Sequence, residues 1–220
     1  MEVTALYLPW TCAIAGYIWA VICFLIVRKN EREENIQENS IYFIKILTFL
    51  AITIVAIFLP SPINLSVSIT LAGFIPTAWS DWKTKYLWDE VIIPTGLLSA
   101  CVMMIGGRGG ESLAGGVLLG LGYYILWAIM TIFKKEIGFG DVKMATVIGF
   151  TLGPVAGIFA FLVACFAGIL LWIYRRNINK DPEIPFGPAL AFGTTVGAFF
   201  VFYLDNYYFW LLPSWFAVKP

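Results

Sequence analysis

The sequence predicts an all-α protein, a polytopic membrane bundle of about eight helical segments in which one segment is short. Its composition is the first reason, because 60% of the 220 residues are hydrophobic and only 13% are charged. Soluble domains are roughly half apolar and about a quarter charged. The second reason is that several apolar runs approach the roughly 20 residues that a helix needs to cross a hydrocarbon core. We therefore expect the lipid bilayer to surround much of the chain.

Short polar loops, glycines and prolines separate the apolar runs. The predicted membrane segments are residues 5–27, 41–59, 65–80, 91–105, 112–133, 142–152, 155–174 and 186–204. The stretch from 142 to 174 is too long for one crossing, and the pair Gly153-Pro154 interrupts it. Proline lacks the backbone donor that a continuous helix requires. We therefore divide this stretch into two segments and expect the first to penetrate only part of the bilayer.

The basic residues predict the orientation. Residues 5–27 follow an acidic residue and precede two basic ones, the reverse of the charge order in a signal peptide, so we expect an anchor with its N-terminus outside. With eight segments, all of the 14 basic residues except Arg108 and Lys219 fall on the inner side. Seven segments would place the basic cluster at 175–180 outside, against the positive-inside tendency. Eight segments therefore fit better.

The segments group into three predicted regions. Residues 1–64 form a two-span N-terminal anchor whose short cytoplasmic loop, 28–40, contains no cysteine. Residues 65–204 form a six-segment core. Residues 205–220 form an aromatic tail, which we expect at the outer interface because Trp and Tyr concentrate at membrane surfaces.

Composition also limits the chemistry. The chain has no histidine, which excludes Ser/His and Cys/His nucleophilic sites and histidine-ligated metals. Its four cysteines stand singly in apolar runs and are expected to be small buried hydrophobes rather than metal ligands. The 14 basic and 14 acidic residues cancel, which argues against a nucleic-acid partner. Proton transfer must therefore involve carboxylates, Lys, Tyr or Cys, and we expect neither a metal ion nor a cofactor.

Two aspartates stand apart from the solvated acids of the loops. Asp81 follows the predicted segment 65–80, and Asp141 ends the tetrapeptide GFGD at 138–141, directly before the short segment 142–152. The predicted topology places both on the same side of the membrane. Two aspartates within hydrogen-bonding reach share a proton, so that one can activate water while the other protonates a leaving group. This arrangement predicts an aspartic peptidase, although Asp141 alone could be a helix cap.

Three stretches of the chain resemble the type IV prepilin peptidases, membrane aspartic peptidases that include the archaeal preflagellin peptidases. They are DWKTKYLWD at 81–89, GFGDVKM at 138–144 and IPFGPA at 184–189. The resemblance implies that Asp81 and Asp141 are the catalytic pair, and it assigns supporting roles to Gly138, Gly140, Lys143 and Asp89. Lys143 could instead be an interfacial lysine, and Asp89 could simply favour the dipole of the following helix.

The resemblance implies a function as well. Family members remove the N-terminal leader from prepilin-like substrates, which carry a hydrophobic helix, at the cytoplasmic face of a prokaryotic inner membrane. Members that also methylate the new N-terminus often carry cysteine pairs in the first inside loop. Because loop 28–40 has none, methyl transfer stays open, as do the identity of the pilin, the bacterial or archaeal source and the formation of a homodimer.

Two alternatives remain from the sequence. A presenilin-like or signal-peptide-peptidase-like intramembrane protease shares the GxGD motif, but its first aspartate usually follows a tyrosine, whereas Ser80 precedes Asp81 here. A small proton-coupled transporter would also use intramembrane acids, but the two-fold hydropathy symmetry common in transporters is lacking.

Overall fold

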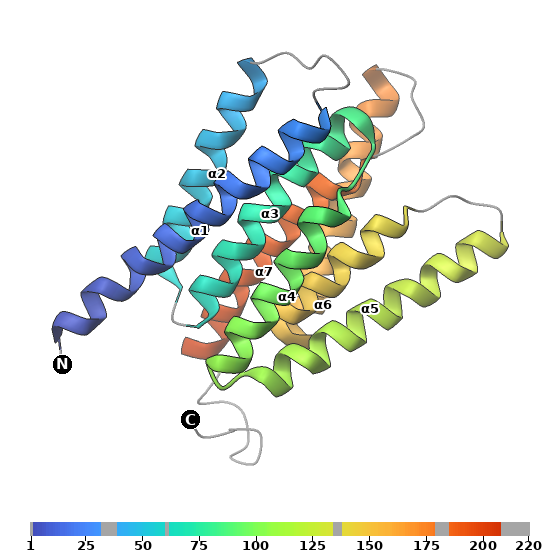
Figure 1. Cartoon of the computed structure of the whole chain (residues 1–220). Coiled ribbons are helices and arrows are strands. Elements are labelled where there is room, and N and C mark those ends of the chain that lie inside the picture. Colours follow the sequence, from blue (N-terminus) through green and yellow to red (C-terminus); the bar gives the residue numbers. More distant parts are fainter. Residues whose placement is uncertain (1, 32–38, 60–61, 134–137, 179–184, 208–220) are drawn as a thin grey trace.

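The described residues of the computed structural model, 2–31, 39–59, 62–133, 138–178 and 185–207, contain helices and no strand (Figure 1). This confirms the predicted all-α class. The seven helical elements are α1 (Glu2–Glu31), α2 (Asn39–Phe58), α3 (Ile63–Thr84), α4 (Asp89–Ile105), α5 (Gly109–Ile132), α6 (Phe139–Ile178) and α7 (Gly187–Tyr207). Much of the predicted loop 28–40 and of the aromatic tail lies outside the described residues.

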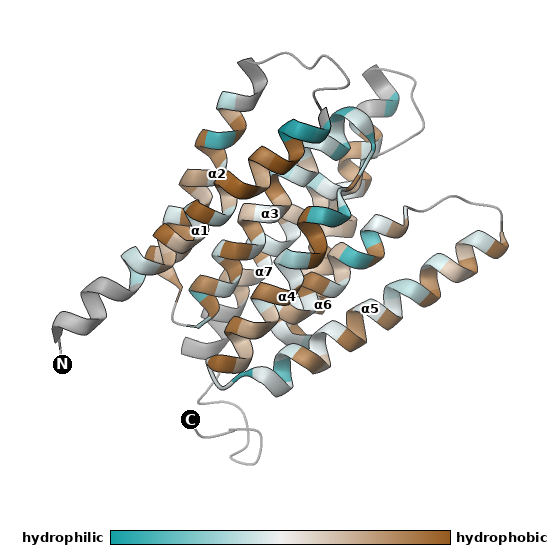
Figure 2. Ribbon diagram, in the orientation of Figure 1, coloured by the Kyte–Doolittle hydropathy of each residue, from teal (hydrophilic) through white to brown (hydrophobic). Residues whose placement is uncertain are grey.

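Three stretches of helix are long and apolar enough to cross a membrane: Pro9–Asn30, Gly109–Ile132 and Phe139–Tyr174. Two shorter apolar stretches are Tyr42–Phe58 and Gly187–Phe200. Many large apolar side chains of these helices are exposed, which suits surrounding lipid because lipid tails solvate them as well as a protein core does. Hydrophobic residues recur along the ribbon of these helices (Figure 2). The chain is thus a membrane protein, and the count of about eight segments stays a prediction.

Helix α3 is the central helix of the bundle (Figure 1). Sixteen of its 22 residues are buried, against α1, α2, α4, α6 and α7. Two of its buried hydroxyl groups bond to neighbouring helices: Ser66 hydrogen-bonds to Ser99 of α4 at 2.5 Å, and Thr70 to Thr151 of α6 at 2.7 Å. Because these bonds join three helices where water is excluded, they fix the position of α3 relative to α4 and α6.

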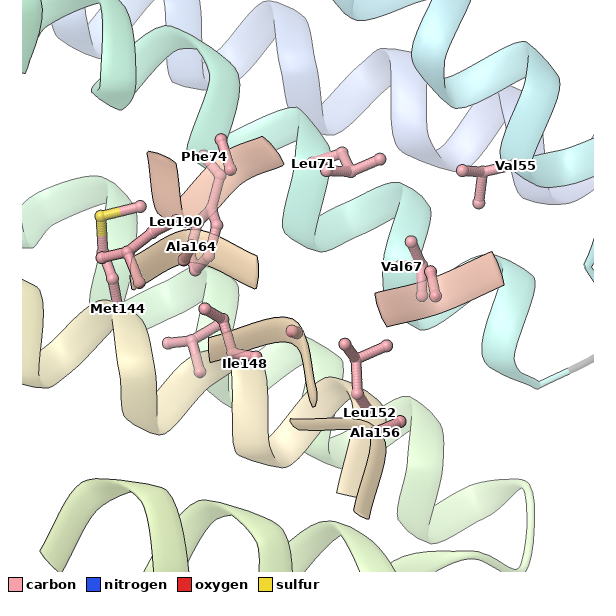
Figure 3. Close-up of a cluster of buried hydrophobic side chains, with 14 of the residues drawn as sticks. Val55, Val67, Leu71, Phe74, Met144, Ile148, Leu152, Ala156, Ala164 and Leu190 are labelled. Atoms are coloured by element: carbon pink, nitrogen blue, oxygen red, sulfur yellow. The ribbon is translucent and has the colours of Figure 1, made fainter. Parts of the chain in front are cut away.

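Apolar side chains complete the contact between α3 and α6. Phe74 and Leu71 of α3 lie in one buried cluster with Met144 and Ile148 of α6 and with Leu190 of α7 (Figure 3). All five side chains are inaccessible to solvent. Since protein interiors are close-packed, this cluster holds α3, α6 and α7 at fixed distances from one another.

Helix α6 reverses direction within its length. Gly153 has φ 74° and ψ −177°, a conformation that L-residues with side chains rarely adopt, and Pro154 follows it. A Cβ built on Gly157 would lie only 3.6 Å from Cα of Gly149, whereas eight residues of straight helix span about 12 Å. The element is therefore a helical hairpin, with limbs at 139–152 and 154–178 (Figure 1). The predicted interruption at Gly153-Pro154 is confirmed.

Candidate functional site

Asp81 lies in the last turn of α3. The helix ends at Thr84 because Lys85 adopts a left-handed conformation with φ 59°, and the Lys85 N–H donates to the backbone oxygen of Asp81 at 2.9 Å. The Asp81 side chain is buried, with 5% of the residue exposed. A carboxyl group at a helix end that is nonetheless buried is costly unless it has partners, so its surroundings identify its role.

Asp141 lies in the first turn of α6, on the limb 139–152. Its backbone N–H donates to the Gly138 oxygen at 3.1 Å, and the residue is 8% exposed. A Cβ on Gly138 would stand 3.5 Å from Oδ2 of Asp141. Gly138 therefore leaves open the space directly beside the carboxylate, where a side chain would otherwise stand.

Gly140 permits the connection between α3 and α4, residues 85–88, to pack on the start of α6. A Cβ on Gly140 would lie 2.7 Å from Cδ1 and 2.8 Å from Cβ of Leu87. Contacts this short do not occur, so a side chain at 140 would displace Leu87. The sequence suggested that the two glycines allow a close approach to Asp141, and the group that approaches Gly140 is Leu87.

The two aspartates, 60 positions apart in the sequence, lie within electrostatic reach of each other in the structure. Their carboxyl groups are close enough to repel each other when both are charged. Since both are nearly enclosed, little water screens this repulsion. The pair therefore favours a state with one proton between the two carboxyl groups.

The stretch IPFGPA at 184–189, the third that resembles the family, also contacts Asp81. The backbone N–H of Gly187, the first residue of α7, donates to Oδ2 of Asp81 at 2.8 Å. A Cβ on Gly187 would lie 2.8 Å from the same oxygen and 3.2 Å from the Asp81 Cβ. The carboxylate thus lies at the N-terminus of a helix, which favours negative charge. The sequence placed Gly187 in a recognisable stretch but gave it no role of its own.

Tyr123 of α5 is a neighbour of Asp141 that sequence reasoning missed. Its buried phenol lies within electrostatic reach of the Asp141 carboxyl group, and its ring meets that of Phe161 edge to face, with 5.2 Å between centroids. Phe161 belongs to the returning limb of α6, so Tyr123 packs between that limb and the residues that follow Asp141, Val142 and Ala145. In the sequence Tyr123 is one aromatic residue in an apolar run, with no local signal to distinguish it.

Lys143 and Asp89 form an ion pair. The Lys143 Nζ lies 2.6 Å from Oδ1 and 2.5 Å from Oδ2 of Asp89. Lys143 follows Asp141 by two residues, and Asp89 is the first residue of α4. The expected roles of these residues, an electrostatic one for Lys143 and a helix-dipole one for Asp89, are therefore connected through one contact. Among the described residues, no three acids or cysteines cluster as metal ligands.

Comparison with known proteins relates the sequence to a known family. Residues 68–173 match the model of the type IV leader peptidase family. The chain is 32% identical over 160 residues to the prepilin leader peptidase/N-methyltransferase of Burkholderia pseudomallei strain 1026b, covering 69% of this chain and 51% of the relative. It is 35% identical over 119 residues to the protein of the same name from Aeromonas hydrophila, covering 47% and 40%.

The chain spans about half the length of these curated relatives. No solved structure matches. The matched residues, 68–173, include Asp81, Asp141 and the Asp89–Lys143 ion pair. They end before α7, so the contact of Gly187 with Asp81 lies outside the matched part.

Proposed function

Since the chain belongs to the type IV leader peptidase family through residues 68–173, we propose that it is an aspartic endopeptidase that removes the leader from type IV prepilin-like proteins. The observation that carries this proposal is that two buried carboxyl groups from distant parts of the chain, Asp81 and Asp141, lie within electrostatic reach of each other. The names of the relatives support prepilins as the substrate class.

The surroundings of the two aspartates differ, and this difference supports distinct roles. Asp81 accepts a hydrogen bond from the Gly187 N–H at the start of α7, which stabilises its charged form. Asp141 lies beside the buried Tyr123, Val142 and Ala145, where a neutral carboxylic acid is better tolerated. We therefore assign Asp81 as the base and Asp141 as the acid.

Cleavage then follows the chemistry of a carboxyl dyad. Ionised Asp81 accepts a proton from water while the water oxygen bonds to the scissile carbonyl carbon. Protonated Asp141 donates its proton to the leaving nitrogen as the C–N bond breaks. The pair ends with the proton on the other aspartate, and exchange with water restores the starting state. Gly138 leaves room beside Asp141 for the substrate backbone.

The distribution of basic residues supports a cytoplasmic active site. One end of the bundle contains the last residues of α1 and α3 and the first residues of α4 and α7. Hydrophilic residues are concentrated at this end (Figure 2). The basic residues at this end include Arg28, Lys29, Lys83, Lys85 and Lys143. By the positive-inside tendency, this end faces the cytoplasm of a prokaryotic inner membrane.

The direct test is a cleavage assay with the purified protein in detergent and a prepilin carrying its leader and hydrophobic helix. We expect a single shortened product by mass spectrometry. Absence of cleavage across several prepilins, or cleavage that persists without both aspartates, would exclude the proposal. Methyl transfer, which the relatives' names include, is tested separately below.

A further inference from the structure

We propose that the ion pair between Asp89 and Lys143 is a positioning clamp that sets the separation of the two catalytic aspartates. The inference rests on the proposed function and adds two residues that act on the reaction without touching the substrate. It also explains why the two segments of the active site carry opposite charges at these positions.

The connection between α3 and α4 touches both catalytic segments. At one side, the Trp88 Nε1 donates to Oγ of Ser80, the neighbour of Asp81, at 2.8 Å. At the other side, Leu87 packs on Gly140, the neighbour of Asp141. The connection therefore bridges the two aspartates through the residue that precedes each of them in the sequence.

The ion pair completes this bridge. Asp89 directly follows the connection, and Lys143 is the fifth residue of α6, two positions after Asp141. The Lys143 Nζ lies within 2.6 Å of both carboxylate oxygens. The Nζ also lies 5.2 Å from the centroid of the Phe139 ring, a distance at which a cation is attracted to an aromatic face. The lysine therefore has two partners that restrict its position, the Asp89 carboxylate and the Phe139 ring.

Exposure distinguishes a positioning role from a stabilising one. The side chains of Lys143 and Asp89 are 28% and 51% exposed, and pairs this accessible to water contribute little to the free energy of unfolding. Their contact instead fixes the start of α4 against the start of α6. Helix α3, which carries Asp81, continues directly into this connection, so movement at Asp89 would change the distance from Asp81 to Asp141.

The clamp predicts an effect on turnover rather than on substrate affinity. A displacement of about 1 Å in a catalytic group can lower the rate on the order of 10²-fold. Asp89→Asn and Lys143→Met should each lower kcat by about that factor, with KM within about threefold of the unmodified protein. Because both substitutions break the same contact, Asp89→Asn/Lys143→Met should lose little more than either alone.

Charge exchange gives the decisive variant. Asp89→Lys/Lys143→Asp restores the attraction with the charges reversed. We expect its kcat to be at least about tenfold higher than that of either single variant. The matched control is Glu90→Gln, which removes the adjacent acid of α4, whose carboxylate accepts from Asn30 at 3.1 Å. This control should keep full activity. Two results would overturn the clamp. One is that the losses in kcat multiply in Asp89→Asn/Lys143→Met, and the other is that each single variant keeps a kcat within about twofold of the unmodified protein.

A cross-link tests the geometry without any substrate. In a chain whose four native cysteines are replaced by alanine, Asp89→Cys/Lys143→Cys should be bridged rapidly by a short bifunctional thiol reagent, and Glu90→Cys/Lys143→Cys slowly. Slow bridging of the first pair would overturn the clamp and leave the peptidase proposal intact. Rapid bridging, together with no prepilin cleavage by the unmodified chain, would support the contact and reject the proposed function.

Discussion

Gly187 donates its backbone N–H to Oδ2 of Asp81 across 106 positions of sequence. Through this bond the start of α7 becomes part of the site, although α7 lies outside the residues that match the family model. The contact makes the two aspartates unequal, because among the described hydrogen bonds only the Asp81 carboxylate accepts a backbone N–H from the start of another helix. Its removal should therefore affect catalysis without removing either carboxyl group.

Gly187→Ala tests this relationship. The added Cβ would lie 2.8 Å from the Asp81 oxygen, so either Asp81 or α7 must move and the hydrogen bond must lengthen. We expect kcat to fall on the order of 10²-fold, the scale of a misplaced catalytic group. Gly122→Ala is the matched control, since its Cβ would meet no atom within 4 Å. Equal activity of the two variants would remove Gly187 from the site.

Replacing either aspartate should abolish cleavage. Asp81→Asn removes the proposed base and Asp141→Asn the proposed acid, and each loss should lower the rate by roughly 10³-fold or more. Both amides have nearly the shape of the carboxyl group, so the proteins should still insert and elute as the unmodified chain does in size-exclusion chromatography. Steady-state cleavage of a prepilin is the measurement. Substantial activity in either variant contradicts the assignment.

The pH dependence of kcat/KM should be bell-shaped. At low pH both carboxyl groups carry protons and no base is available, whereas at high pH both are ionised and no acid is available. Only the singly protonated pair is active. The rising and falling sides of the pH profile therefore report pKa values that belong to the pair rather than to either residue. A rate that rises with pH to a plateau, with no fall at higher pH, would show that the second carboxyl group need not be protonated.

Reporter fusions should locate the site on the cytoplasmic side. A fusion after Lys85, beside Asp81, and one after Arg176, near the end of the returning limb of α6, should both read as cytoplasmic. A fusion after Gly110, in the first turn of α5, should read as external. An external reading at Arg176 would mean that α6 crosses the membrane once, in conflict with its reversal at Gly153.

Methyl transfer is expected to be absent or to need other residues. The loop 28–40 carries no cysteine, so the purified protein should contain no stoichiometric zinc when measured by plasma mass spectrometry. In the cleavage assay with S-adenosylmethionine present, the product should have a free N-terminal amine. A product heavier by one methyl group, formed only with this protein, would show that methylation does not require a cysteine-bearing loop.

The sequence predicted the parts of this structure that depend on local pattern. Apolar length predicted helices, and the Gly153-Pro154 pair predicted the interruption of α6, because both are properties of a few adjacent residues. The pair Asp81 and Asp141 was selected from the family resemblance and from the cost of acids near lipid, and its catalytic role stays a prediction until the variants are measured.

Contacts between distant segments were not predictable in the same way. Nothing in the run around Tyr123 indicates that its phenol lies beside Asp141, since that depends on how α5 packs on both limbs of α6. Likewise, Lys143 and Asp89 each had a plausible local interpretation, as an interfacial lysine and as a helix-dipole charge. Only the three-dimensional arrangement joins them in one contact.

The reversal of α6 at Gly153 has a consequence for biogenesis. No charged residue lies between Lys143 and Arg175. The second limb of α6 runs back to the end of the bundle at which the first limb begins (Figure 1). The insertion machinery can therefore release this pair of limbs sideways into lipid as a preformed hairpin. No lysine or arginine then has to be carried through the hydrocarbon, a passage that costs about 2.5–3.5 kcal/mol for each such residue at the membrane centre.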